Sequence, residues 1–157
     1  MIHPIVSKTF QVSESDIDEL NHVNNQVYVR WLEEAARYAS AQNGWSSKEY
    51  FENGYAWVVR QHWIEYLRPC FSGDEVTIYT WVSAMSEGRS LRRYALVRNG
   101  KLCVTAATEW NLINVKTGRA IPCPENMAAC FEVVPDDDVR LKELKIHRPL
   151  RYEPTGL

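Results

Sequence analysis

The spacing of hydrophobic residues changes along this chain at about residue 54. Before that point, apolar or small residues recur every four positions up to Asn43-Gly44, which is the spacing of one face of an α-helix. These residues are Val23, Val27, Trp31, Ala35 and Ala39, with Tyr28, Leu32 and Ala36 on the adjoining row. The pattern predicts a helix of about five turns that starts at Val23 and has a broad buried face.

After Asn53-Gly54 the chain is rich in Trp, Tyr, Val, Ile and Thr, which is typical of β-strands. Glycine and proline divide it into four predicted strands, at about 55–67, 74–86, 89–98 and 101–114. Within it, Asn99-Gly100 is the strongest hairpin signal. A shorter strand at about 5–13 precedes the helix, and short helices are predicted near 46–53 and 125–131. With no βαβ alternation, this order predicts an α+β protein in which one helix packs on a mostly antiparallel sheet.

The chain contains 157 residues, which fits one domain with a substantial core. We find no internal repeat and no linker of domain length, so we expect a single domain over residues 1–157 with its core at about 5–131. The remaining segment, about 132–157, is charged, contains proline and has weak periodicity. It is therefore predicted to be an extended or partly ordered tail.

Charge and cysteine content narrow the class of ligand. Eighteen basic and twenty acidic residues give a formal net charge of −2, which argues against broad attraction to nucleic acid or to an anionic membrane. No window holds eighteen consecutive apolar residues, and the N-terminus lacks the pattern of a secretory leader. The four cysteines form no Cys-x-x-Cys pair and the four histidines are scattered, so we expect no metal site. We therefore expect a cytoplasmic protein whose cysteines are free thiols. We also expect it to bind a small soluble ligand.

The polar stretch from Asp16 to Asn25 runs directly into the predicted long helix. The first backbone amides of a helix have no partner within the helix, and they favour negative charge. A thioester or amide carbonyl docked there would meet ready hydrogen-bond donors with a carboxylate close by. The stretch is therefore the first candidate for an active site.

Three stretches of the chain form a recognisable combination. They are Asp18 with His22-Val23-Asn24-Asn25, Tyr28, Trp31, Glu34 and Ala35; then Tyr66-Leu67-Arg68-Pro69 leading to Gly73-Asp74; and finally Trp110 with Thr117-Gly118-Arg119 and Ile121-Pro122. Together they resemble the hotdog-fold acyl-CoA thioesterases of the 4-hydroxybenzoyl-CoA thioesterase type. The resemblance covers roughly residues 5–131, in the same order as the predicted elements.

This resemblance implies a five-stranded antiparallel sheet wrapped around one long helix. It also implies a homodimer formed edge to edge, or a dimer of such dimers, with each active site between two subunits and with no metal or organic cofactor. The catalytic carboxylate falls on Asp18, which either attacks the thioester carbonyl or positions water for that attack. The backbone amide that polarises the thioester oxygen falls on Asn25.

The other residues of the loop allow structural or catalytic interpretations. His22 could orient the acid or the substrate, or it could be a neutral histidine bonded to a backbone carbonyl. Asp16 is expected to shape the loop through an Asx-type turn. Asn21 stands where most relatives carry glycine, and asparagine tolerates a left-handed backbone. Leu20 stands where plant acyl-carrier-protein thioesterases carry asparagine, so their triad of carboxylate, asparagine and histidine is in doubt here.

Candidates for substrate contact lie in and beyond the loop: Asn24, Tyr28, Trp57, Ser90 and Arg89. Asn24 is also a favourable helix cap, and Trp57, together with Tyr55, is a candidate for lining an acyl pocket. Ser90 could face the thioester or serve a turn. Arg89 belongs to a basic run that could meet the phosphates of CoA or form a solvated edge; strand alternation within it places Arg92 and Arg93 on opposite faces.

Two glutamates within the helix, Glu33 and Glu34, are reserve candidates, since another group of hotdog thioesterases takes its carboxylate from this helix. The alternative is that they pair with Arg30 or Arg37.

The sequence thus predicts an acyl-CoA thioesterase that hydrolyses a thioester to a free acid and CoA. Two alternatives stay open. One is a thioesterase that acts on acyl carrier protein, and the other is a non-catalytic module that binds acyl-CoA, because one fold serves many functions.

Overall fold

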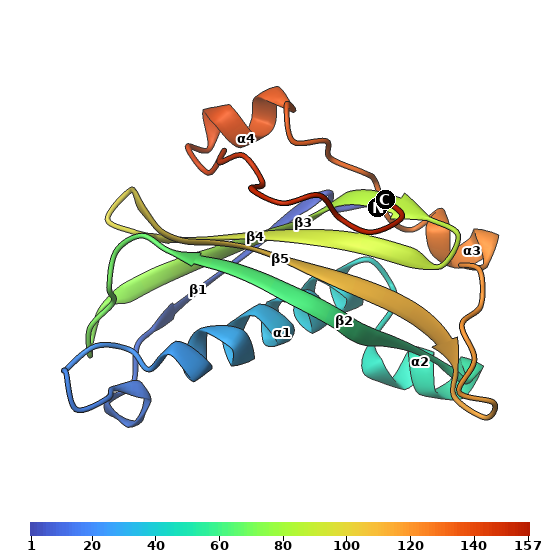
Figure 1. The fold of residues 1–157 in the computed structure, drawn as a ribbon, viewed down its shortest axis with the longest axis horizontal. Helices are drawn as coiled ribbons and strands as arrows, with labels where there is room; N and C mark the ends of the chain where they lie inside the picture. Colours follow the sequence, from blue (N-terminus) through green and yellow to red (C-terminus); the bar gives the residue numbers. More distant parts are fainter.

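The computed structural model describes all 157 residues. Five strands form one antiparallel sheet in the order β1-β3-β4-β5-β2. Their bounds are β1 Ile5–Gln11, β2 Tyr55–Tyr66, β3 Glu75–Ser86, β4 Arg89–Arg98 and β5 Lys101–Asn114. Figure 1 shows the strands curving together over one long helix. The α+β hotdog architecture and all five predicted strands are confirmed, with ends that differ by two residues or fewer.

The central helix, α1, spans Asn25–Gln42 and lies along one face of the sheet (Figure 1). It starts two residues later than the prediction from Val23. The reason is that Val23 belongs to the loop: it forms a β-bridge with Ile17, and its N–H donates to the Cys70 carbonyl at 2.9 Å. Val23 is therefore buried at a position that fits the four-residue spacing of the helix, although it lies outside the helix.

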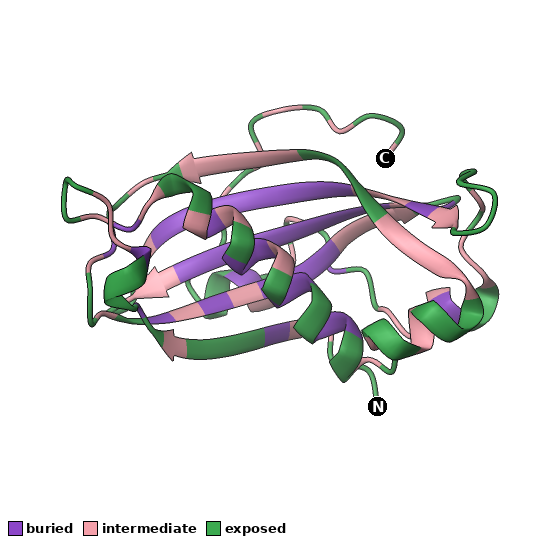
Figure 2. Ribbon diagram, turned by 90° about the horizontal axis from the view of Figure 1, so that it is seen from below, coloured by how far each residue is buried: buried purple, intermediate pink, exposed green.

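The predicted buried face of α1 is confirmed. Its buried residues are Tyr28, Trp31, Leu32, Ala35, Ala36, Ala39 and Ser40. The first five join a core cluster that includes Val76, Ile78, Tyr94 and Leu96 from β3 and β4. Figure 2 views the molecule from the helix side and shows that the central strands are the most buried, whereas β1 and β2 form the two edges of the sheet.

A short helix, α2 (Ser47–Asn53), follows α1 and packs beside the start of β2. The Ser46 side chain caps it by accepting from the Glu49 N–H at 3.2 Å. Gly54 ends it with φ 73°, a left-handed backbone that favours glycine. At the predicted hairpin, Asn99 and Gly100 have φ 50° and 72°, which is the pairing expected for a tight turn between antiparallel strands. No helix combines the length and the hydropathy needed to cross a bilayer.

The C-terminal segment, which was expected to be an extended or partly ordered tail, is packed against the sheet. After a single-turn helix, α3 (Glu125–Ala128, shorter than the predicted 125–131), the chain crosses to the outer face of the sheet and forms α4 (Val139–Glu143). There Val134, Leu141 and Ile146 pack on Trp81 and Ala95. Val134 lies in an extended stretch and its N–H donates to the Val82 carbonyl, Leu141 lies in α4, and Ile146 follows that helix. For this reason the segment has no periodicity to detect, although it buries an apolar surface.

Candidate active site

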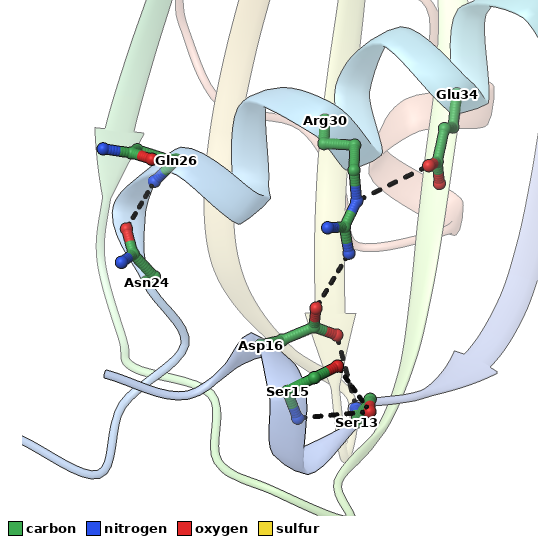
Figure 3. A network of polar contacts seen from close by, with 7 residues as sticks. All are labelled: Ser13, Ser15, Asp16, Asn24, Gln26, Arg30 and Glu34. Carbon is green, nitrogen blue, oxygen red and sulfur yellow. Dashed lines mark hydrogen bonds and ion pairs between the residues drawn. The ribbon is translucent and has the colours of Figure 1, made fainter. Parts of the chain in front are cut away.

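Asp16 holds the loop between β1 and α1 in place. A capping box joins Ser13 and Asp16 at the short 3₁₀-helix η1 (Glu14–Asp16). The Asp16 carboxylate, 9% exposed, also accepts from the Arg30 guanidinium of α1 at 2.8 Å (Figure 3). Asp16 therefore shapes the loop as expected, but through a capping box and an ion pair instead of an Asx turn. The ion pair ties the loop to the first turns of the helix.

The Asx-type turn belongs to Asp18. Its Oδ1 accepts from the backbone N–H groups of Leu20 at 2.9 Å and of His22 at 3.2 Å. Its own N–H donates to the His22 carbonyl at 2.8 Å. Between them, Asn21 takes the left-handed backbone that was expected of it, with φ 63°. Both side-chain bonds are to Oδ1, so they hold the Asp18 carboxylate in place while Oδ2 has no partner within the protein.

The start of α1 leaves one amide available. Asn24 caps the helix: its side-chain oxygen accepts from the Gln26 N–H at 3.0 Å (Figure 3). Its carbonyl accepts from the Val27 N–H at 2.9 Å. The Asn25 N–H has no acceptor within the protein. Asn25 also lines a cavity of about 230 Å³, together with His22, Tyr28, Tyr66 and the turn Leu67–Pro69. A carbonyl oxygen placed in this cavity could meet an unpaired donor at a helix N-terminus.

The other residues of this cavity are held firmly. Tyr28 is 4% exposed, its hydroxyl accepts from the Cys70 N–H at 3.2 Å, and burial raises its pKa well above the ordinary value. The phenol is therefore neutral and acts as part of the wall. The His22 ring packs edge-on against Phe71 with centroids 5.4 Å apart, and Tyr66 donates from its hydroxyl to the Asn25 carbonyl at 3.3 Å.

A second, larger cavity of about 790 Å³ opens between the C-terminal half of α1, α2 and the first half of β2. Its wall includes several aromatic side chains, namely Trp45, Tyr50, Phe51, Tyr55, Trp57, Trp110 and Phe131. Trp57 donates from Nε1 to the Tyr50 hydroxyl at 3.1 Å, which also bonds the Ser40 hydroxyl at 2.8 Å. Ser90 and Arg92 enter the same wall from β4. The size and lining fit an acyl group.

The structure thus distributes the predicted residues over two places. His22, Asn25 and Tyr28 line the small cavity at the start of α1, where Asp18 is bonded to His22 and Asn24 caps the helix. Trp57 and Ser90 line the large cavity beside its C-terminal half. An 18-residue helix is about 27 Å long. Within a single chain, the two groups are therefore separated by most of the helix.

Arg89 belongs to neither group. It faces the outer side of the sheet and donates to the Thr155 carbonyl of the C-terminal segment at 3.1 Å. Glu34 forms an ion pair with Arg30 at 3.5 Å, which agrees with the expected alternative to a catalytic role. Glu33 lines the large cavity, where its carboxylate lies 4.0 Å from Arg37 and 3.4 Å from His62 Nε2.

Two residues of the cavities were not singled out by sequence reasoning. Tyr66 was named only as part of a motif, although it lines the small cavity. Arg92 was grouped with a basic run, although alternation along β4 places it on the same face as Ser90 and the core residue Tyr94. That alternation was the signal that could have identified Arg92.

Comparison with known proteins agrees with this architecture. A family model described as the thioesterase-like superfamily matches residues 12–131. A DHNA-CoA thioesterase from Staphylococcus aureus superimposes with a TM-score of 0.72 at 24% identity, over 78% of this chain and 81% of that one. A hypothetical protein from the same organism, solved in complex with CoA, gives 0.77 at 20% identity over 99% and 92%. A gentisyl-coenzyme A thioesterase gives 0.75 at 16% identity over 81% and 100%. No curated protein matches the chain.

The fold, the loop and the matched region together define a hotdog thioesterase. The chain belongs to the thioesterase-like superfamily, and the predicted relationship to hotdog thioesterases is confirmed. The match starts at Val12, just before the Asp18 loop, and ends at Phe131, where the chain crosses to the outer face of the sheet.

Proposed function

We propose that the protein is an acyl-CoA thioesterase that hydrolyses a thioester to a free carboxylic acid and CoA. The observation that carries this proposal is the unpaired Asn25 N–H at the start of α1, next to a loop that fixes Asp18 through one carboxyl oxygen. Similarity to a protein solved with CoA supports a CoA thioester as the substrate class.

In the proposed mechanism, the thioester oxygen accepts a hydrogen bond from the Asn25 N–H, which stabilises the negative charge that develops on this oxygen. Asp18 Oδ2 either attacks the carbonyl carbon or removes a proton from an attacking water. The bond to sulfur then breaks, and CoA leaves as a thiolate. If water attacked, this step gives the free acid directly; if Asp18 attacked, the acyl group is left on Asp18 as a mixed anhydride, which water hydrolyses to the free acid and the Asp18 carboxylate. Because a thiolate is a good leaving group, a positioned carboxylate and a polarised carbonyl suffice without a metal.

We further propose that two subunits join along the free edge of β2, which exposes Val58, Val59 and Tyr66 by 39%, 38% and 46%. In an antiparallel pair of β2 strands centred on the middle of the strand, Tyr66 of one subunit lies near Tyr55 of the other. Tyr66 contacts Asn25, and Tyr55 lines the large cavity. The catalytic loop of one subunit would then face the acyl cavity of its partner, which would reunite the two groups of residues.

The direct test is release of thiol from a panel of acyl-CoAs by the purified protein, with and without Asp18→Asn. We expect kcat/KM to fall by about 100-fold to 10,000-fold in the variant, the range typical of a general acid or base. Glu19→Gln, which removes a neighbouring exposed carboxylate, should leave turnover unchanged. Full turnover by Asp18→Asn would remove the assignment.

The alternatives are separated when matched acyl-carrier-protein substrates and a binding measurement are added to this panel. A large preference for matched acyl-carrier-protein substrates would indicate a carrier-protein thioesterase, and tight binding without hydrolysis of any substrate would indicate a binding module.

All four cysteines are free thiols, which supports the proposal of a cytoplasmic location.

A further inference from the structure

Arg92 is a buried cation without a carboxylate partner. The residue is 7% exposed, and its side chain makes one hydrogen bond within the protein, from Nη1 to the Thr80 hydroxyl at 3.2 Å. A guanidinium carries five N–H donors and stays charged in proteins. Burial therefore leaves this group with a positive charge and several donors that the protein does not use. Such a group is costly unless a partner neutralises it.

The neighbouring Arg93 shows what a satisfied buried arginine looks like in this fold. It is 1% exposed and faces the opposite side of the sheet. It pairs with Asp136 at 2.9 Å and donates to the Arg148 carbonyl at 2.9 Å, with further bonds to Ala106 and Thr105. The C-terminal segment supplies the anion that Arg93 requires. No segment of the chain does so for Arg92.

The surroundings of Arg92 indicate where its partner would come from. The residue lines the large cavity, whose wall is mostly apolar. Glu33 is the only carboxylate in the cavity wall, and it lies beside Arg37 and His62. The other cations of the wall, Arg37 and Lys116, are exposed at its rim. Arg92 is thus the one buried charge within the cavity.

We infer that the cavity accepts an acyl group that ends in a carboxylate, and that Arg92 binds this carboxylate at the end remote from the thioester. This inference rests on the proposed function for the thioester itself and adds the substrate class: ω-carboxyacyl-CoA, the monothioester of a dicarboxylic acid. A carboxylate matches the planar fork of a guanidinium with two parallel hydrogen bonds and neutralises its charge. A hydroxyl group could accept a hydrogen bond but would leave the charge unpaired.

The inference predicts a preference between substrates that differ by a single group. Adipoyl-CoA and hexanoyl-CoA have chains of equal length and differ in a terminal carboxylate or methyl group, as do suberoyl-CoA and octanoyl-CoA. We expect kcat/KM to be at least about tenfold higher for the carboxylate member of a pair, since a hydrogen-bonded charge discriminates by about tenfold to a hundredfold. In Arg92→Met this advantage should disappear, because kcat/KM for adipoyl-CoA and suberoyl-CoA falls toward the values for hexanoyl-CoA and octanoyl-CoA.

Two controls accompany these measurements. Lys48→Met removes an exposed cation on α2 that does not line the cavity, and it should leave the substrate preference unchanged. A thermal melt of Arg92→Met should lie at or above that of the wild type, because the variant removes an unpaired buried charge and keeps an unbranched side chain. A melt well below that of the wild type, with the preference lost, would mean that Arg92 supports the fold instead, and would overturn the inference.

Binding to Asp18→Asn, measured by calorimetry, separates this inference from the proposed function. Tighter binding of adipoyl-CoA than of hexanoyl-CoA, lost in the double variant with Arg92→Met, supports the carboxylate site even if no acyl-CoA is hydrolysed. Equal binding of the two overturns it, even if both are hydrolysed. A preference for 4-hydroxybenzoyl-CoA over benzoyl-CoA that depends on Arg92, with none for adipoyl-CoA, would also overturn it in favour of a hydroxyaryl group.

Discussion

Asp18 and His22 are joined by two hydrogen bonds: the Asp18 N–H donates to the His22 carbonyl at 2.8 Å, and Asp18 Oδ1 accepts from the His22 N–H at 3.2 Å. The loop therefore closes on the residue proposed to perform the chemistry. One carboxyl oxygen holds the loop and the other is available to a substrate. A structural role and a catalytic role for Asp18 are thus compatible, because they use different atoms.

Comparison of Asp18→Asn with Asp18→Ala should separate these two roles. Asparagine keeps the side-chain oxygen that accepts from Leu20 and His22, so we expect stability close to that of the wild type. Alanine removes both bonds and should lower the free energy of unfolding by about 1–2 kcal/mol. Urea denaturation measures the difference, and thiol release should be lost in both variants. Equal stability of the two variants would show that the loop does not depend on these bonds.

The ion pair between Asp16 and Arg30 is expected to set the position of the loop on α1. Asp16→Asn keeps the volume but loses the charge, and should cost about 1–3 kcal/mol in the free energy of unfolding, since the carboxylate is largely buried. We also expect kcat to fall, because Asp18 would be held less firmly. Glu34→Gln breaks the exposed pair with the same arginine and serves as the control, with a cost below about 0.5 kcal/mol.

The proposed dimer can be tested at the edge of β2. Val59→Glu places a charge in the middle of this edge, where a paired strand would bury it without a partner. We expect the mass in solution at micromolar concentration to change from that of a dimer to that of a monomer, with loss of activity. Val139→Glu, on the exposed helix α4, makes the same chemical change away from this edge and should leave the mass unaltered. A wild-type protein that is already monomeric would refute the shared site.

Acid should loosen the C-terminal segment before the rest of the fold. The Arg140 guanidinium lowers the pKa of Asp138, the cap of α4, to about 2, and Arg148 lowers the pKa of Glu65. A carboxylate whose pKa is lowered by folding contributes its full stability above its ordinary pKa, near 4, and loses it as the pH falls through about 2. Hydrogen exchange of residues 132–157, corrected for intrinsic rates, should therefore accelerate between about pH 4 and pH 2 relative to β4.

In Asp138→Asn the contribution of this cap to the acid sensitivity should be smaller, and exchange in α4 should already be faster at pH 6. If exchange of the segment in the wild type does not respond to acid, these ion pairs do not hold the segment on the sheet.

Local sequence was sufficient for most of the architecture, because the spacing of apolar residues and the turn residues act over a few positions. The four-residue spacing from Val27 to Ala39 identified the helix, and Asn99-Gly100 identified its hairpin. The same locality brought Asp18, His22 and Asn25 together, since they lie within eight positions on one loop and helix start.

Contacts between distant residues decided the rest. The Val23 N–H donates to the carbonyl of Cys70, far away in the sequence, and this bond holds Val23 in the loop, so that the helix starts after it. Val134, Leu141 and Ile146 have no shared spacing, so only their packing on Trp81 reveals an ordered segment. Strand alternation separates Arg92 from Arg93, but only the folded chain shows that one has a carboxylate partner and the other has none. Charge pairing depends on which side chains meet in space, and the order of residues alone does not contain that information.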